Sequence, residues 1–157
     1  MILLALSLAC TPKAVKVAQR LEGNYQLGDP GSSWRVVKSG GADFAYRDTG
    51  NAAVIYADSN CGARFEDSKL EDLATHLSFG VRMGEPKDER RFELDGRSAY
   101  SMRAVGELDG VPIELATTVL KKDLCVYDIV LIAPRGERFE AAHAGYQSAV
   151  SGFRTQR

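Results

Sequence analysis

The fold of this chain is decided by residues 90–133, which read RRFELDGRSAYSMRAVGELDGVPIELATTVLKKDLCVYDIVLIA. Two Asp-Gly pairs, at 95–96 and 109–110, interrupt this stretch, and Asp-Gly is a dipeptide that tight two-residue hairpins prefer. The segments around these pairs have the alternating or apolar patterns of β-strands. The stretch therefore predicts an antiparallel meander with strands over 90–94, 98–107, 111–120 and 124–133.

The last of these strands is apolar on both faces, with the exception of Asp128. A strand of this kind belongs in the middle of a sheet that is covered on both sides. A carboxylate buried there must be paired or hydrogen-bonded. Two interpretations of Asp128 stay open: an ion pair across the sheet, for example with Arg103, or the wall of a ligand pocket. Asp128 is therefore the candidate ligand-binding residue.

Shorter strands are predicted before the meander, at 34–37, 43–47 and 52–57, because turn residues separate these segments. On the second strand of the meander, Ser101 and Arg103 alternate with apolar residues and predict a face exposed to water.

Two amphipathic helices complete the pattern. The first begins near Ser68, which fits a capping box with Glu71, and Gly80 is placed to end it. The second carries an apolar stripe at helical spacing, made up of Phe139, Ala142, His143, Tyr146, Ala149, Val150 and Phe153. The predicted fold class is α+β, a twisted antiparallel sheet with two main helices packed on it.

Length and charge limit the domain organisation and the partners. The chain has 157 residues and a formal net charge of −1. The length suits one domain, placed at 34–157, after a tether and lead-in loop over 11–33. Lysine and arginine are interspersed with acidic residues, so the basic stripe of a nucleic-acid binder is missing and no nucleic-acid partner is expected.

The first ten residues, MILLALSLAC, form an uncharged apolar run that ends in a cysteine. The run is too short to span a bilayer, which needs about 20 apolar residues, but it suits the apolar part of a secretory signal. Leu8-Ala9-Cys10 resembles the lipobox of bacterial lipoproteins, although Ser7 stands where that family prefers leucine and no positive charge precedes Cys10. The alternative is an ordinary hydrophobic N-terminus with a buried cysteine.

The lipobox resemblance implies a location. Residues 1–10 would form the signal peptide and lipobox, and Cys10 would be acylated, with palmitate among the acyl groups. Thr11 in place of aspartate implies sorting to the outer membrane, facing the periplasm. The chain would then be tethered to a membrane through its lipid.

The other two cysteines, Cys61 and Cys125, form an even pair if Cys10 carries lipid. In an oxidising compartment a disulfide between them is the default expectation. Two separate buried thiols are the alternative. A third interpretation is a Cys–His nucleophile, in which either thiol meets His76 in space.

Further catalytic and metal motifs are missing from the sequence. It contains neither a glycine-rich phosphate loop nor a Gly-x-Ser-x-Gly elbow. The only histidines, His76 and His143, fall in different predicted helices without zinc-ligand spacing. His143 lies on an apolar stripe, where a packed core histidine is expected. We therefore expect no enzyme, no catalytic residue, no metal and no cofactor.

Four short segments carry a further resemblance: 58–61 (DSNC), 108–112 (LDGVP), 121–128 (KKDLCVYD) and 150–153 (VSGF). With them the chain resembles a group of uncharacterised lipoproteins from deltaproteobacteria-like Gram-negative bacteria. The element order is similar to the PsbP-like α/β/α sandwich of the photosystem II extrinsic subunit. That resemblance implies a non-enzymatic accessory subunit and carries no activity of its own.

Three functions are therefore distinguished. The leading hypothesis is a membrane-anchored envelope lipoprotein with an accessory or assembly role, which binds an envelope protein partner. The second is a module that binds a small molecule or lipid in a pocket between helix and sheet, near Asp128. The third is an enzyme that uses a Cys–His pair.

Overall fold

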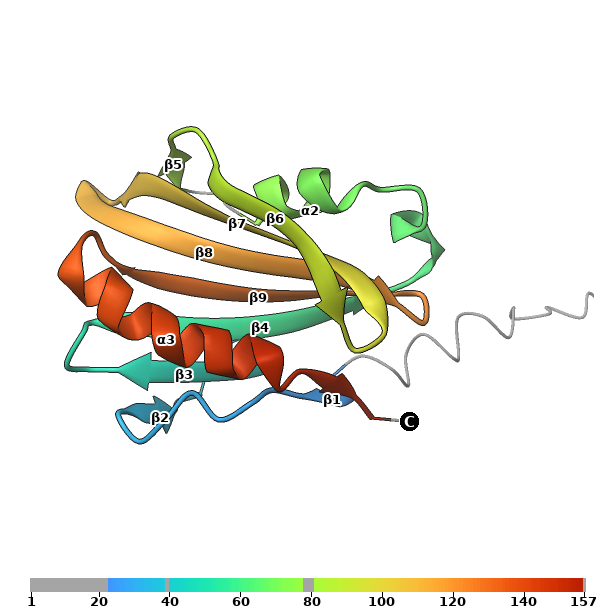
Figure 1. The fold of residues 1–157 in the computed structure, drawn as a ribbon, viewed down its shortest axis with the longest axis horizontal. Helices are drawn as coiled ribbons and strands as arrows, with labels where there is room; N and C mark the ends of the chain where they lie inside the picture. Colours follow the sequence, from blue (N-terminus) through green and yellow to red (C-terminus); the bar gives the residue numbers. More distant parts are fainter. Residues whose placement is uncertain (1–22, 39, 78–80, 157) are drawn as a thin grey trace, which may run out of the picture.

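A computed structural model of the chain describes residues 23–38, 40–77 and 81–156. Cys10, the predicted signal peptide and the first half of the predicted tether lie outside the described residues. The described part contains an eight-stranded antiparallel sheet, a two-stranded sheet and two α-helices (Figure 1). Neither described helix has the length and apolar composition that crossing a bilayer would require.

The large sheet has the strand order β2-β3-β4-β9-β8-β7, and both β5 and β6 pair with the outer edge of β7. The two-stranded sheet joins β1 to β10. The elements are β1 (Tyr25–Gln26), β2 (Trp34–Val36), β3 (Phe44–Asp48), β4 (Ala53–Cys61), the 3₁₀ helix η1 (Ala63–Phe65), α2 (Leu70–His76), β5 (Arg82–Met83), β6 (Lys87–Leu94), β7 (Arg97–Leu108), β8 (Val111–Lys122), β9 (Cys125–Pro134), α3 (Glu137–Ser151) and β10 (Arg154–Thr155).

The predicted meander is present as β6-β7-β8-β9, and its first two turns are the predicted Asp-Gly pairs. Both residues of each turn have positive φ, 48° and 73° at 95–96 and 50° and 80° at 109–110, as a type I′ turn requires. The third turn consists of Asp123 and Leu124, with φ of 51° and 65°. Leucine is disfavoured in this left-handed conformation, so no residue pattern predicts this turn.

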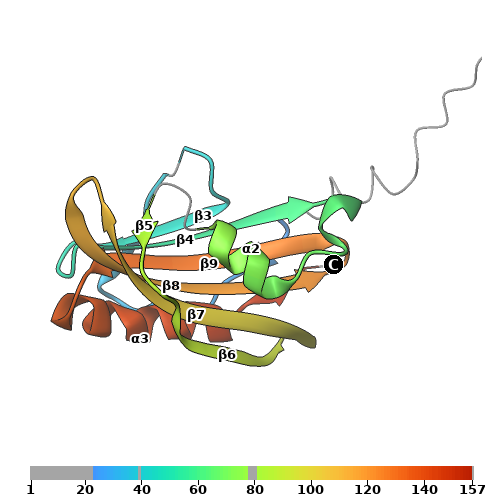
Figure 2. The same ribbon diagram turned by 90° about the horizontal axis from the view of Figure 1, so that it is seen from above.

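The two α-helices cover opposite faces of the sheet, as Figures 1 and 2 show. On one face Phe139 of α3 and Ile129 of β9 both belong to the larger core cluster. On the other face Leu70 of α2 packs with Val119 and Val126. The strand β9 is therefore buried from both sides, as its apolar composition predicts, and the α+β fold class is confirmed.

Three local predictions need correction. The helix α2 begins after Lys69, and no side chain caps it, so the Ser68 capping box is wrong. The Glu71 carboxylate instead pairs with Arg91 of β6, while the Ser68 carbonyl accepts a hydrogen bond from Lys121 Nζ at 2.7 Å. Both residues of the expected capping box, Ser68 and Glu71, are therefore engaged in tertiary contacts.

The predicted wet face of β7 is also covered. Ser101 is 8% exposed because α3 lies over this face. The Arg103 guanidinium, on the same face, pairs with Glu114 of β8 and Glu140 of α3 and lies over the ring of Phe139. The alternation of polar and apolar residues along β7 therefore distinguishes two faces that pack against different helices, and neither face is exposed to solvent.

The packed domain begins before residue 34, inside the stretch predicted as a lead-in loop. Tyr25 of β1 is only 3% exposed. Its ring makes edge contacts with Phe44 and Tyr127, at centroid distances of 5.0 and 5.2 Å. The pairing of β1 with β10 brings this tyrosine into the core, and a two-residue strand of this kind leaves no periodic pattern in the sequence.

One side chain links three separate segments at the end of the sheet. Asp95, in the β6–β7 turn, accepts a hydrogen bond from Lys122 Nζ at 2.7 Å. The same carboxylate oxygen accepts from the backbone N–H and the hydroxyl of Thr155, at 2.9 and 2.8 Å. Burial alone would raise the pKa of Asp95, but these hydrogen bonds outweigh it and bring the pKa to about 2.

We expect Asp95→Asn to lower the free energy of unfolding by about 2–3 kcal/mol at pH 7, because it weakens charge-assisted hydrogen bonds to Lys122 and Thr155. The depressed pKa means that this stabilisation is present above about pH 4 and is lost as the pH falls toward 2. Urea unfolding at pH 7 measures the loss. Asp109→Asn, at the exposed equivalent turn, is the matched control, and an equal loss in both variants would contradict the role of Asp95.

Candidate functional site

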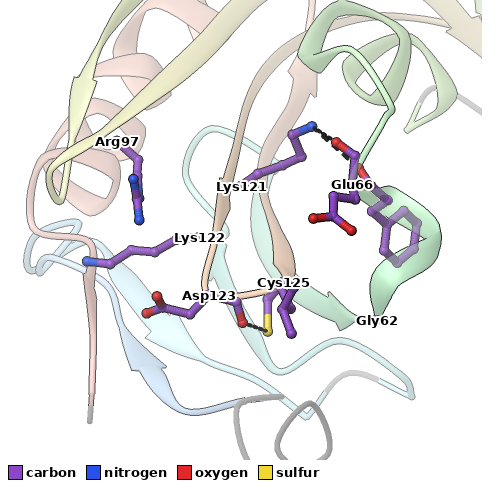
Figure 3. Close-up of a pocket in the computed structure, with 9 residues that line it drawn as sticks. Gly62, Glu66, Arg97, Lys121, Lys122, Asp123 and Cys125 are labelled. Atoms are coloured by element: carbon purple, nitrogen blue, oxygen red, sulfur yellow. Dashed lines mark hydrogen bonds between the residues drawn. The ribbon is translucent and has the colours of Figure 1, made fainter. Parts of the chain in front are cut away.

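Two cavities lie on either side of Phe65, near the end of the sheet where β8 turns into β9. We call the first the hairpin cleft and the second the Asp128 cavity. The hairpin cleft has a volume of about 390 Å³ and is shown in Figure 3. It is lined by Gly62, Phe65, Glu66, Arg97, Lys121, Lys122, Asp123, Leu124 and Cys125.

The lysines of the hairpin cleft are engaged in internal contacts. Lys121 Nζ donates to the carbonyl oxygen of Glu66 at 2.9 Å (Figure 3). It also donates to the carbonyl oxygen of Ser68 at 2.7 Å, and so fixes the loop between η1 and α2. Lys122 is held by Asp95. The two lysines of the cleft therefore stabilise the fold.

A disulfide forms one wall of the hairpin cleft. Cys61 ends β4 and Cys125 begins β9, and the two residues are direct partners in the strand register, with their Cα atoms 4.0 Å apart. The structure joins their sulfur atoms. Neither sulfur is therefore a thiolate, and the Cys–His nucleophile with His76 is not formed in this structure.

The Asp128 cavity lies between α2 and the sheet and has a volume of about 160 Å³. Most of its wall is apolar, and three polar side chains, Asn60, His76 and Asp128, reach it. The apolar lining residues are Phe65, Leu73, Leu77, Val119 and Val126. An apolar cavity with a few convergent polar groups is the usual form of a ligand-binding site.

Asp128 lies in this cavity with an unsatisfied carboxylate oxygen. The residue is only 5% exposed, and its Oδ1 atom has no hydrogen-bond partner among the described residues. The expected ion pair with Arg103 is wrong, because the two side chains are on opposite faces of the sheet. Asp128 faces α2, whereas Arg103 contacts α3.

The environment of Asp128 favours its protonated form. Burial is the main cause, and the carboxylates of Asp58 and Asp43 add like-charge repulsion, so that the pKa of Asp128 rises to about 7. Asp58 of β4 is the direct register partner of Asp128. Carboxyl groups with strongly shifted pKa values are common at functional sites, although structural clusters produce them as well.

The two histidines have different surroundings. His76, at the end of α2, is exposed at the rim of the Asp128 cavity, and its Nδ1 atom lies 2.7 Å from the carbonyl oxygen of Asp72. His143 is half-buried on α3 and stacks between Phe139 and Tyr146. Burial, followed by the charge of Arg103, lowers the pKa of His143, which fits the expected packed histidine.

Sequence reasoning selected Asp128 for this cavity but missed its neighbours. Asn60 and His76 come from β4 and α2, and only the packing of α2 on the sheet brings them together. The alternation of Asp58 and Asn60 along β4 was the available signal, because residues two apart share a face. No group of three metal-ligating side chains occurs within residues 23–38, 40–77 and 81–156.

Comparisons with known proteins identify the fold. The sequence matches no protein-family model and no curated protein. The structure is similar to cyanobacterial PsbP (CyanoP) from Synechocystis sp. PCC 6803, with a TM-score of 0.62 and 11% identity over 85% of this chain and 88% of that one. It is also similar to LpqN, involved in cell envelope biogenesis of Mycobacterium tuberculosis, with a TM-score of 0.59 and 13% identity over 85% and 83% of the two chains. The fold is therefore PsbP-like.

We expect Asp128→Asn to stabilise the protein above pH 8, by roughly 1–4 kcal/mol, because it removes a buried ionised carboxylate. A raised pKa means that the folding penalty of Asp128 is absent below about pH 4 and complete above pH 7. The gain should therefore shrink as the pH is lowered from 8 to 4, as urea unfolding at each pH would measure. Asp67→Asn, at an exposed position outside the cavity, is the control. A gain that does not depend on pH would show that Asp128 is not the buried titrating group.

Proposed function

We propose that this chain is an accessory protein of the bacterial cell envelope that acts by binding and not by catalysis. The observation that carries the proposal is the Asp128 cavity, where a buried carboxylate oxygen without a protein partner faces a small apolar space. A binding protein gains from such a group, because a ligand supplies the missing hydrogen bond. The described residues hold no nucleophile–base pair beside the cavity, since both nearby cysteines are in a disulfide.

Two further features support an envelope location. A disulfide between Cys61 and Cys125 is stable in an oxidising compartment outside the cytosol. The PsbP-like fold is shared with a mycobacterial protein involved in cell envelope biogenesis. The fold by itself carries no function, so this second feature supports the location only by analogy.

The membrane anchor belongs to the same proposal. Leu8-Ala9-Cys10 has the form of a lipobox, and an acyl chain on Cys10 would hold the domain at a membrane surface. In bacterial lipoproteins with this lipobox, a residue such as Thr11 favours the outer membrane, which would place the domain in the periplasm. The partner is then an envelope protein that reaches the Asp128 cavity.

The apolar walls of the cavity favour a second candidate function, the binding of a free small molecule or lipid. The cavity is small, about 160 Å³, which excludes drug-sized ligands and most of a lipid molecule. In this case the chain would carry or sense a ligand without an obligatory protein partner.

We expect wild-type protein expressed from its own gene to fractionate with membranes and Cys10→Ala to become soluble, because the substitution removes the acylated side chain. Immunoblots of washed membrane and soluble fractions measure the distribution. Asp67→Asn, at an exposed position, is the control, since it leaves both Cys10 and the Cys61–Cys125 disulfide in place. A Cys10→Ala protein that stays membrane-bound would overturn the lipid anchor.

The binding role is tested by crosslinking in intact cells, followed by purification of the protein with its captured neighbours. We expect a defined envelope protein to be captured by the wild type and by Asp67→Asn, and to be depleted at least about five-fold with Asp128→Asn, because charge-assisted hydrogen bonds contribute roughly 1.5–3 kcal/mol. Identical captured proteins from all three forms would contradict a partner role for the Asp128 cavity.

A further inference from the structure

We propose that the Asp128 cavity binds the ammonium end of an alkyl chain, the group found in free alkylamines and in lysine side chains. The inference rests on the proposed binding function and names the chemistry of the ligand for the same cavity. Three independent properties of the cavity lead to it: its need for a hydrogen-bond donor, its charge and its size.

The first property is a buried acceptor without a partner. Asp128 Oδ1 accepts no hydrogen bond within the described residues, although the amide of Asn60 also lines the cavity. At the rim, His76 Nδ1 faces the Asp72 carbonyl oxygen at 2.7 Å, and because a carbonyl can only accept, Nδ1 carries the proton. In the neutral ring Nε2 is then a second acceptor. An ammonium group offers three donors to such a site.

The second property is negative charge. Asp58 and Asp128 are direct partners on adjacent strands and share the face that α2 covers. Among the described residues that line the cavity there is no lysine or arginine. A phosphate or carboxylate ligand would be repelled there, whereas a cation is attracted by both carboxylates. The charge therefore favours an ammonium over a hydroxyl or an amide of the same size.

The third property is the size and apolarity of the space. Cavities near 150 Å³ hold about six non-hydrogen atoms, the size of benzene, and the Asp128 cavity has about 160 Å³. Its walls include Leu73, Val119 and Val126, which pack well against methylene groups. A butyl chain with a terminal ammonium fills this space, while a sugar or a nucleotide exceeds it. The four methylene groups of a lysine side chain have the same length as this butyl chain.

The test is a titration of the purified domain, with its disulfide intact, by n-butylammonium, 1-butanol and butyrate. Heteronuclear NMR measures the affinity and also locates the site. We expect n-butylammonium to bind at least about ten-fold more tightly than 1-butanol, with shift changes at the lining residues, because a charge-assisted hydrogen bond contributes roughly 1.5–3 kcal/mol. Butyrate should not bind. Equal affinity for the amine and the alcohol, or shift changes elsewhere, would overturn the proposal.

A pair of variants isolates the carboxylate. Asp128→Asn keeps the shape of the side chain and should lower the affinity for n-butylammonium at least about ten-fold, with little effect on 1-butanol. Asp67→Asn removes an exposed charge outside the cavity and should leave both affinities unchanged. The proposal is wrong if Asp128→Asn binds the amine as tightly as the wild type, and folding of each variant is checked in the same NMR spectra.

The affinity should also depend on pH, since only the ionised carboxylate attracts the ammonium. With the pKa of Asp128 near 7, the affinity rises about ten-fold between pH 6 and pH 8. The other titratable groups around Asp128 are Asp58, Asp43 and Tyr56 on the sheet side, Tyr25 of β1 and His76 on α2. Asp128→Asn retains all of them, so a ten-fold rise that persists in this variant would assign the dependence to another group and contradict the proposal.

One further ligand distinguishes the source of the ammonium group. Nα-acetyl-lysine amide presents a lysine side chain. If it binds about as tightly as n-butylammonium, a lysine of a partner protein can be the ligand. If n-butylammonium binds and Nα-acetyl-lysine amide does not, the ligand is a free amine. The outcome is separate from the test of the proposed function. Amine binding without a crosslinked partner supports this inference and contradicts the partner role. A crosslinked partner without amine binding supports the partner role and contradicts this inference.

Discussion

The structure depends on one constraint, the burial of β9 on both of its faces. Residues 125–134 are almost entirely apolar, so neither face can be left in water. The sheet satisfies this by placing β9 between β4 and β8 and by packing α3 on one face and α2 on the other. The disulfide from Cys61 to Cys125 then fastens the start of β9 to the end of β4.

The same constraint gives Asp128 its chemistry. A carboxyl group on an exposed strand would be hydrated, but in the middle of β9 it is desolvated and faces the apolar side of α2. The carboxylate of its register partner, Asp58, adds repulsion that the hydrogen bond from the Asp58 backbone only partly offsets. A fold that only needed stability would favour an apolar residue here, since buried unpaired carboxylates cost stability. In the proposed function, the cavity beside Asp128 gives this residue a use in binding.

Several other charged residues serve the fold. Arg103, Glu114 and Glu140 tie β7 and β8 to α3, and Lys122 and Asp95 tie the end of β8 to the β6–β7 turn. The lysines that line the hairpin cleft are used in the same way. Asp128 differs from all of them because no cation of the described chain approaches it, and this difference separates the candidate site from the structural ion pairs.

The sequence by itself determined the meander, the two Asp-Gly turns, the amphipathic helix over α3 and the strand buried on both faces, because these follow from local turn chemistry and from hydrophobic periodicity. It could also single out Asp128, as a charge where the pattern demands an apolar residue. Tertiary structure alone decided that α2 and α3 lie on opposite faces, that Arg103 therefore cannot reach Asp128, and that Leu124 is held in a left-handed turn. It also brought Asn60 and His76 to one cavity. These outcomes depend on contacts between segments far apart in the chain, and periodicity within one segment carries no information about which segment will face it.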